Sequence, residues 1–318
     1  MKYQLVGIAL ACLSGITQAD EGAPSQPVTV VVGYAPGGTA DIVMRQLAAL
    51  MQPKFPAGLI VANRPGAGGA TALSSLVQAK PDGLQFVFAP NSNVALSPQV
   101  LKTPYKTPDD IEYVADVASF SPILVVPTSS RFKNLGQLVS EARGAAESKV
   151  SIGFPGVTTF SHFSVLTLAK VSGANLIEVP FAGWGQGGPQ LLGGQISAAV
   201  AQPVEVSSQI QAGTLRVLAS FSEERQGGLP DAPTAKEQGF PVSMGVRYML
   251  LAHKSTPKPA VKHMHDALKA AMETQQFRDF AKNGGMEIVY RDGEAAKAKT
   301  WVDYRRVTEL LKQVNTTK

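Results

Sequence analysis

Four short segments of the sequence combine glycines with small hydroxyl or amide side chains, and each follows an apolar, strand-like run. They read "YAPGGTAD" (34–41), "APNSN" (89–93), "FPGVTTFSH" (154–162) and "FAGWGQGG" (181–188). Glycine lets a ligand approach the backbone closely, and the first N–H groups of a helix carry a partial positive charge and have no partner inside the helix. Such turns can therefore hold a carboxylate without a lysine or an arginine.

Each segment alone is more typical of an ordinary turn with a helix N-cap. Their positions change that interpretation. Two lie in each half of the chain, and all four stand where an open parallel sheet places its ligands, outside the carboxyl ends of its strands. Together they predict a binding site for a small anion.

Signals for a cofactor are weak. The segment "GWGQGG" matches the glycine pattern of a dinucleotide site, and Glu205 follows about 20 residues later. We reject this site, because Gly193 and Gly194 interrupt the segment "PQLLGGQIS" before a crossover helix can form. The sequence has no GxSxG nucleophile elbow and no P-loop. We therefore expect no cofactor.

The histidines and acidic pairs do not suggest catalysis or metal binding. His263 and His265 are two residues apart on an expected helix, which points them to different faces. His162 lies in the first turn of another expected helix and could cap it, pack, or line the site. The acidic pairs at 109–110 and 223–224 adjoin turns and are typical of solvated faces. We expect no catalytic residue and no metal site.

Strand-like and helix-like segments alternate along the chain, which is typical of parallel βαβ units and indicates an α/β fold. In the first block, strands are expected at 28–34, 59–65 and 85–90, with helices from about Asp41, within 66–80 and after 90. In the second block, strands are expected at 150–154, 175–181, 196–202 and 215–221, with helices at 134–146, 160–173 and 205–213. Two more helices are expected near 258–274 and 294–313.

Two similar blocks of about 100 residues or more suggest two lobes with a cleft between them. Extended crossings are expected near 123–127 and 247–251, and the last helices should return to the first lobe. We therefore expect lobe 1 to comprise residues 26–124 and 248–318, and lobe 2 residues 125–247.

The N-terminus is typical of a secretory signal peptide. Met1 and Lys2 precede the apolar run "LVGIALACL", and "ITQAD" offers cleavage after Ala19. No later window approaches the run of about 20 apolar residues that a membrane-spanning helix needs. Cys12 lies in the signal and is the only cysteine, and "ALAC" is a poor lipoprotein box. A mature chain without disulfides fits a bacterial periplasm.

The formal net charge is +5, from 29 basic and 24 acidic residues. No cluster of lysines and arginines interleaved with aromatic residues is present, so we expect no nucleic-acid partner. The mild positive charge predisposes the protein at most toward anionic small molecules.

Several motifs in order resemble the Bug receptors, the periplasmic solute-binding proteins of tripartite tricarboxylate transporters. They are "YAPGGTAD", "VANRPGAGG", "AKPDG", "SHF", "VPFAGWGQGGPQLLGGQI", "IQAGTLRVLA", "LPDAPTAKEQGFP" and "LLAHKSTP", and they cover essentially the whole mature chain. The resemblance implies a two-lobed type II periplasmic binding protein fold with a central ligand cleft. It also implies a small carboxylate ligand, the permease subunits of such a transporter as partners, and a monomer.

The resemblance further implies which residues contact the ligand, mostly through loop backbone, short polar side chains and ordered waters. In lobe 1 they are Tyr34, Gly37, Gly38, Thr39, Asp41 and Asn91, and in lobe 2 they are Thr158, Thr159, Ser161, His162, Phe181, Ala182 and Trp184.

The chain departs from the family pattern at three places. Members often have a tyrosine and a lysine where this chain has Phe181 and Ala182, and an aspartate where it has Ala201. A less charged pocket, with Phe154, Phe160, Phe181 and Trp184 near its mouth, could suit an aromatic or longer apolar carboxylate better than an amino acid. Arg247 stands in place of a tryptophan, and it could meet a second carboxylate or form a structural ion pair.

The leading hypothesis is a receptor that is not an enzyme, closes on a mono- or dicarboxylate, and delivers it to a membrane permease. One alternative is an exported α/β enzyme acting on a small carboxylate, which would need a nucleophile with its base or a metal cluster. Another is a ligand sensor that docks on a signalling kinase. The sequence does not separate transport from sensing.

Overall fold

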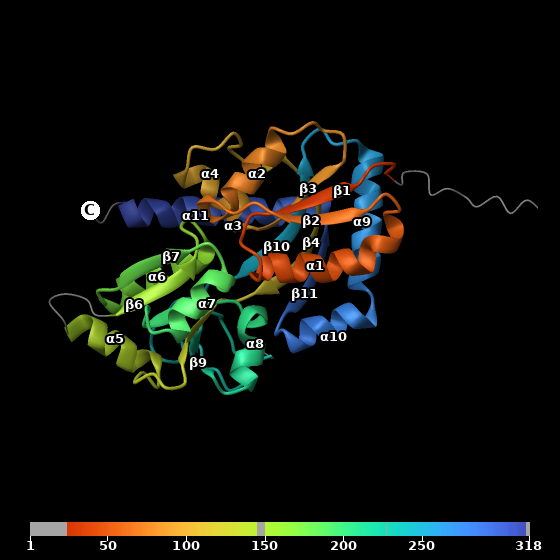
Figure 1. The fold of residues 1–318 in the computed structure, drawn as a ribbon. Helices are drawn as coiled ribbons and strands as arrows, with labels where there is room; N and C mark the ends of the chain where they lie inside the picture. The colour runs from red at the N-terminus through yellow and green to blue at the C-terminus, as the bar shows by residue number, and fades with distance from the viewer. Residues whose placement is uncertain (1–23, 145–149, 227, 316–318) are drawn as a thin grey trace, which may run out of the picture.

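The computed structural model describes residues 24–144, 150–226 and 228–315. The expected signal peptide, residues 1–19, lies outside the described residues. The chain forms two α/β lobes, each built around its own sheet (Figure 1). The α/β fold class is confirmed. No helix in the described ranges has the length and apolar character needed to cross a bilayer.

The sheet of lobe 1 has six strands in the order β11-β4-β10-β3-β1-β2. Strands β1, β2 and β3 run parallel, whereas β10 is antiparallel to β3 and β4, and β11 is antiparallel to β4. The three strands expected in the first block are parallel, as βαβ units require, and the antiparallel pairings of β4, β10 and β11 were not expected. The strands are β1 (Val28–Val32), β2 (Leu59–Asn63), β3 (Gln85–Pro90), β4 (Ile111–Phe120), β10 (Val246–His253) and β11 (Glu287–Asp292).

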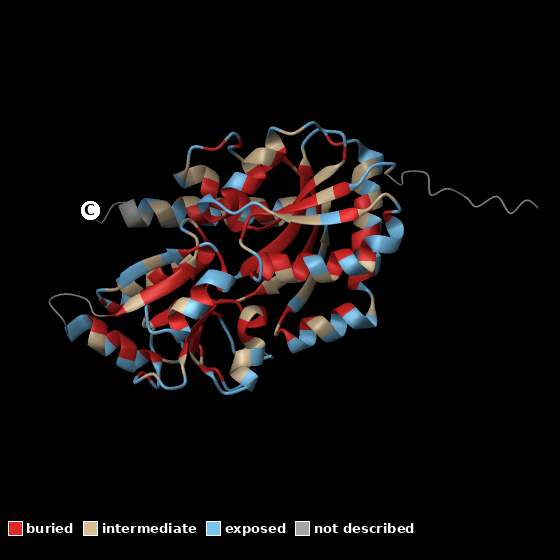
Figure 2. Cartoon of the chain, in the orientation of Figure 1, coloured by how far each residue is buried: buried red, intermediate tan, exposed pale blue. Residues whose placement is uncertain are grey.

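Helices cover both faces of this sheet because its central strands bury alternate side chains on opposite sides. Val30 and Val32 of β1 join a cluster with α1 and α9, while Val31 joins a cluster with α2. Buried residues gather along the central strands, and the helices expose their outer sides (Figure 2). The helices of lobe 1 are α1 (Thr39–Met51), α2 (Ala70–Val77), α3 (Ser92–Ala95), α4 (Ser97–Val100), α9 (Lys258–Met272), α10 (Gln275–Asn283) and α11 (Gly293–Asn315), with 3₁₀ turns at Gln52–Lys54, Ala67–Gly69 and Pro108–Asp110.

The sheet of lobe 2 has five strands in the order β7-β6-β8-β5-β9, with β5 antiparallel to both neighbours. Leu124 and Val126 of β5 face a core with α5 and α6, and Ile123 and Val125 face a core with α7 and α8. The elements are β5 (Ile123–Pro127), α5 (Leu135–Gly144), β6 (Ser151–Pro155), α6 (Phe160–Ser172), β7 (Ile177–Phe181), α7 (Trp184–Leu192), β8 (Ala198–Ala201), α8 (Pro203–Gln211) and β9 (Leu215–Ser220).

The chain passes between the lobes twice. The first passage lies between Phe120, the last residue of β4, and Ile123, the first residue of β5. The second precedes β10, which begins at Val246. Both passages lie slightly before the crossings expected near 123–127 and 247–251. Ile123 already pairs with β8 inside the sheet of lobe 2, and Arg247 already pairs with β4 inside the sheet of lobe 1. After the second passage, α9 and α11 pack against β4 of lobe 1.

Helix α7 corrects one expectation. Gly193 and Gly194 were expected to interrupt the segment "PQLLGGQIS" before a crossover helix could form. The helix Trp184–Leu192 does end before Gly193, yet it connects β7 to β8. Its glycines allow close packing: a Cβ at Gly187 would lie 2.5 Å from the ring of Phe181, and one at Gly185 would lie 2.8 Å from the carbonyl oxygen of Pro36. Tertiary contact here outweighs the low helix propensity of glycine.

Candidate ligand-binding site

A cavity of about 20 Å³ lies between the two lobes. All four glycine- and hydroxyl-containing turns contribute to its wall, together with the start of α8 and strand β10. From lobe 1 it is lined by Tyr34, Gly38, Thr39, Ala40, Pro90, Ser92, Val246 and Tyr248, and from lobe 2 by Pro155, Thr159, Phe160, Ser161, Gly183, Gln202 and Glu205.

Five of the expected contacts line this cavity: Tyr34, Gly38, Thr39, Thr159 and Ser161. Helix α1 begins at Thr39 and helix α6 at Phe160, directly after Thr159. The N-termini of one helix from each lobe therefore meet at the same cavity, which is the arrangement that favours an anion.

The start of α1 is already bonded to a carboxylate of the chain itself. Glu205 Oε1 accepts a hydrogen bond from the backbone N–H of Thr39 at 2.8 Å, and Oε2 accepts one from the N–H of Gln202 at 2.8 Å. Burial raises the pKa of Glu205 above its ordinary value, and the two N–H groups oppose that rise. Glu205 stands on α8 in lobe 2, so it joins the two lobes at the predicted anion position.

The start of α6 is organised by its own side chains. Thr159 caps the helix by accepting a hydrogen bond from the N–H of His162 at 3.1 Å. The amide nitrogen of Gln202 donates a long hydrogen bond, 3.4 Å, to the hydroxyl of Ser161. The Gln202 amide oxygen and the Ser92 hydroxyl are buried and have no hydrogen-bond partner among the residues that the structure describes. These two atoms give the cavity further polar capacity.

Two tyrosines form much of the remaining wall. The hydroxyl of Tyr34 donates to the carbonyl oxygen of Gly68 at 2.7 Å, and Tyr248 stacks on Phe88 with ring centroids 5.7 Å apart. Burial raises the pKa of both hydroxyls above 10, so they stay neutral at physiological pH. They can bind a ligand through hydrogen bonds and ring faces, without a charge of their own.

Direct backbone contacts hold the lobes together beside the cavity. The N–H of Ala35 in lobe 1 donates to the carbonyl oxygen of Ala182 in lobe 2 at 3.1 Å. On the other side, a Cβ at Gly156 would lie 2.8 Å from the Cα of Gly68. Only glycine permits such an approach of two backbones, so both glycines are required by the closed arrangement.

Three expected contacts in lobe 1 support the site and do not line it. Asp41 accepts hydrogen bonds from the N–H of Gly37 at 3.0 Å and from the side chain of Asn63 at 2.9 Å, and it pairs with Arg45. It therefore fixes the turn before α1. Asn91 accepts from the N–H of Arg247 at 3.1 Å and donates to Asp303 at 2.9 Å, so its side chain is engaged within lobe 1.

The other expected contacts in lobe 2 also lie outside the wall. His162 Nε2 lies 2.8 Å from Glu178, and its ring stacks on Phe154. Phe181 and Trp184 pack in the core with α7 and α8, while Ala182 takes part through its carbonyl oxygen. Thr158 adopts a left-handed conformation with φ of 60°. Of the four aromatic residues expected near the mouth, Phe160 lines the cavity, together with the two tyrosines named above, whereas Phe154, Phe181 and Trp184 do not.

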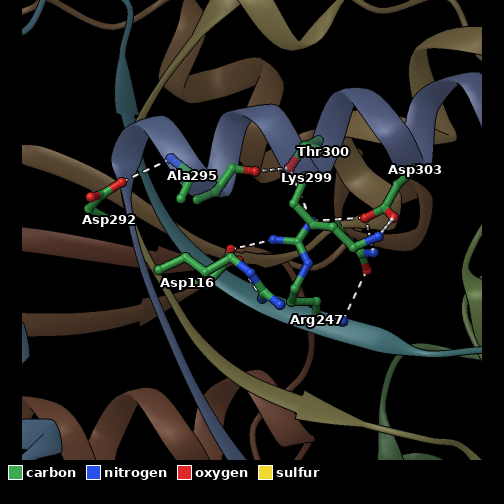
Figure 3. A network of polar contacts seen from close by, with 10 residues as sticks. Asp116, Arg247, Asp292, Ala295, Lys299, Thr300 and Asp303 are labelled. Carbon is green, nitrogen blue, oxygen red and sulfur yellow. Dashed lines mark hydrogen bonds and ion pairs between the residues drawn. The ribbon is translucent and has the colours of Figure 1, made fainter.

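Arg247 forms a structural ion-pair network behind β10 (Figure 3). Its guanidinium pairs with Asp116 of β4 and, at 2.8 Å, with Asp303 of α11, and it donates to Thr300 at 3.2 Å. Asp116 also pairs with Arg291 at 3.2 Å. Of the two roles that the sequence left open, this geometry is that of the structural ion pair, because both carboxylates belong to the protein.

Within the described residues, no cluster of three or more histidine, cysteine, aspartate or glutamate side chains is arranged to hold a metal ion. His263 Nε2 donates to the carbonyl oxygen of Lys54 at 2.9 Å, and His265 contacts Asp266 and Tyr290. Both histidines lie on α9, outside the cavity wall.

A family model described as "Tripartite tricarboxylate transporter family receptor" matches residues 43–315. The chain belongs to this receptor family. It is 31% identical over 289 residues to the "UPF0065 protein in gbd 5'region" of Cupriavidus necator. The match covers 90% of this chain and 86% of that protein. Among solved structures, the periplasmic binding protein BugD superposes with a TM-score of 0.86, at 28% identity and over 92% of this chain and 98% of BugD.

The receptor also resembles MatC from Rhodopseudomonas palustris, solved with bound malate, with a TM-score of 0.84, 25% identity, and coverage of 90% of this chain and 99% of MatC. The family is one of solute-binding receptors. The two-lobed fold implied by the sequence motifs is thereby confirmed.

Sequence reasoning missed the fifth turn that lines the cavity. Gln202 and Glu205 follow β8 just as the other four turns follow their strands. The signal was present, because a proline followed two residues later by a glutamate, as in Pro203 and Glu205, is typical of the first turn of a helix. Ser92, Val246 and Tyr248 were missed for another reason: they reach the cavity only once β10 lies between β3 and β4.

Proposed function

We propose that this receptor is exported to the periplasm, closes on a small mono- or dicarboxylate between its lobes, and delivers it to the permease subunits of a tripartite tricarboxylate transporter. The observation that carries the proposal is the convergence of five strand-to-helix turns, from two lobes, on one cavity. The likeness to MatC, which was solved with malate, supports a small carboxylate as the ligand class.

We place the ligand between the starts of α1 and α6. Tyr34, Gly38 and Thr39 would contact it from lobe 1, and Thr159 and Ser161 from lobe 2. The other expected residues act indirectly in this proposal. Asp41 stabilises the first turn by accepting the N–H of Gly37. The carbonyl oxygen of Ala182 accepts the N–H of Ala35, and this hydrogen bond joins the lobes after closure.

Ligand entry requires the lobes to separate. A cavity of about 20 Å³ holds about one water molecule, and a dicarboxylate is several times larger. The two chain passages near residues 121–122 and before Val246 are the natural hinges, because there the chain crosses from one sheet to the other. In this scheme the receptor acts as a monomer, its signal peptide is removed on export, and no chemistry occurs on the ligand.

A thermal-shift screen tests the proposal. The mature chain should show a higher melting temperature with at least one acid from a set of aliphatic and aromatic mono- and dicarboxylates, because a ligand that binds only the folded state stabilises it. Neutral sugars of similar size serve as the control and should have no effect. Stabilisation by a neutral sugar, with none by any carboxylate, would contradict the proposal. Consumption of the stabilising acid over hours would show an enzyme.

A further inference from the structure

Glu205 is the one charged side chain among the residues that line the cavity in the described structure. Its two oxygens each accept one backbone N–H, from Thr39 in lobe 1 and from Gln202 in lobe 2. A carboxylate offers about four lone-pair sites. Glu205 therefore keeps the capacity to accept further hydrogen bonds from a molecule in the cavity.

Other carboxylates in this protein show what Glu205 lacks. Asp116, fully buried, pairs with Arg247 and Arg291, and Asp41 pairs with Arg45. Glu205 has no lysine, arginine or histidine within ion-pair distance in the described part of the chain. Burial accordingly raises its pKa, since the charged form has no cation beside it.

We infer that Glu205 determines the specificity of the receptor: the ligand carries, besides its carboxylate, an ammonium or amide N–H that donates to Glu205. This inference rests on the proposed function and names the class of ligand more narrowly. A ligand carboxylate placed at the start of α1 would lie against Glu205, and two carboxylates that share a site repel each other. An N–H donor of the ligand at that place would instead form a charge-assisted hydrogen bond with the Glu205 carboxylate.

The start of α6 is then the position for the ligand's carboxylate. It supplies the N-terminus of a helix of 13 residues and the hydroxyl of Ser161 in the first turn of that helix. Ser92 and Gln202 also line the cavity, and the Ser92 hydroxyl and the Gln202 amide oxygen are buried with no partner in the described residues. The cavity thus offers an acceptor at Glu205 and a set of donors at the start of α6.

This ligand class differs from the one favoured by the sequence. Ala182 and Ala201, in place of a lysine and an aspartate, suggested a less charged pocket suited to an apolar acid. Glu205 brings one negative charge back into the pocket from α8.

Calorimetric titration with matched acids tests the inference. The probes are three pairs that differ by an amino group: propionate and β-alanine, succinate and L-aspartate, benzoate and 4-aminobenzoate. The wild-type chain should bind the amino member of at least one pair about tenfold to a hundredfold more tightly, as a charge-assisted hydrogen bond provides. Glu205→Gln should remove this preference, and Glu178→Gln, which alters a carboxylate beside His162 outside the cavity, should keep it.

Two results would overturn the inference while leaving the proposed function intact. One is equal or tighter binding of the plain acids by the wild-type chain. The other is a Glu205→Gln variant that weakens both members of a pair by the same factor. If Glu205→Gln fails to fold, the wild-type comparison still decides. Failure of all six acids to bind would count against the proposed function as well.

Discussion

Glu205 on α8 of lobe 2 accepts a hydrogen bond from the backbone N–H of Thr39, at the start of α1 in lobe 1, at 2.8 Å. The contact places a carboxylate of the protein where the sequence predicts a ligand's carboxylate. Because the bond joins the two lobes, opening of the cleft must break it. The same contact therefore governs both which ligand is accepted and how the lobes close.

Stability should depend on pH through Glu205. Burial raises its pKa in the folded protein above the ordinary value of 4.5. A group of this kind contributes stability below its unfolded pKa and loses it as pH rises through the folded pKa. The wild-type chain should therefore lose stability relative to Glu205→Gln as pH rises from 4.5 through that raised folded pKa, measured by urea unfolding at several pH values between 4.5 and 8.

The neighbouring groups do not obscure this test. Tyr34 and Tyr248, the titratable groups that face Glu205, have pKa values raised above 10 and stay neutral over the whole range. A stability difference between wild type and variant that is constant from pH 4.5 to pH 8 would show that Glu205 does not titrate in the closed protein.

Gly185→Ala should hinder closure without disturbing the fold. The added Cβ would lie 2.8 Å from the carbonyl oxygen of Pro36 in the opposite lobe, and alanine favours a helix over glycine by about 1 kcal/mol. We expect an unchanged or higher melting temperature without ligand, together with ligand affinity weakened by about 1–3 kcal/mol from the overpacked contact. Calorimetry and small-angle scattering measure the two effects.

Gly144→Ala is the matched control, since it adds a methyl group at the last residue of helix α5 in lobe 2, where no described atom outside its own backbone segment lies within 4 Å of the Cβ position. Wild-type affinity in Gly185→Ala would mean that the lobes do not approach this closely when ligand is bound.

Removal of Arg247 should destabilise the fold. Arg247→Met leaves Asp116, which is fully buried, without its main partner, and breaking a buried pair in this way costs about 3–5 kcal/mol. The exposed pair of Arg225 with Glu237 provides the control, and Arg225→Met should cost less than about 1 kcal/mol. Urea unfolding measures both. A near-normal stability of Arg247→Met with a large loss of carboxylate affinity would instead make Arg247 a ligand contact.

Much of the fold follows from local sequence pattern, and what was missed depends on distant partners. Strand β4 carries Asp116 inside an otherwise apolar run. The sequence around Asp116 does not explain this buried carboxylate, because its ion-pair partners Arg247 and Arg291 come from β10 and β11. Helix α10 buries only Phe277 and Ala281 among its described residues, so its apolar signal is short. Neither the antiparallel strands nor their register is set by residues near them in sequence.

The site shows the same division. Tyr34, Gly38 and Thr39 were predictable, because a glycine turn before an amphipathic helix has a known geometry at the edge of a parallel sheet. His162 and Asn91 have the right residue types, but Glu178 and Asp303 engage their side chains. Only the folded chain reveals which polar groups already have partners and that Glu205 takes the N–H of Thr39.

A crystal structure with the most stabilising acid of the screen tests the central claim, that the ligand lies between the two lobes, most directly. We expect its density between the starts of α1 and α6, with its carboxylate within hydrogen-bond distance of Ser161 and a donor group facing Glu205. Density in the separate groove of lobe 1 that Lys54, Lys258 and His263 line, with the inter-lobe cavity unchanged, would contradict it.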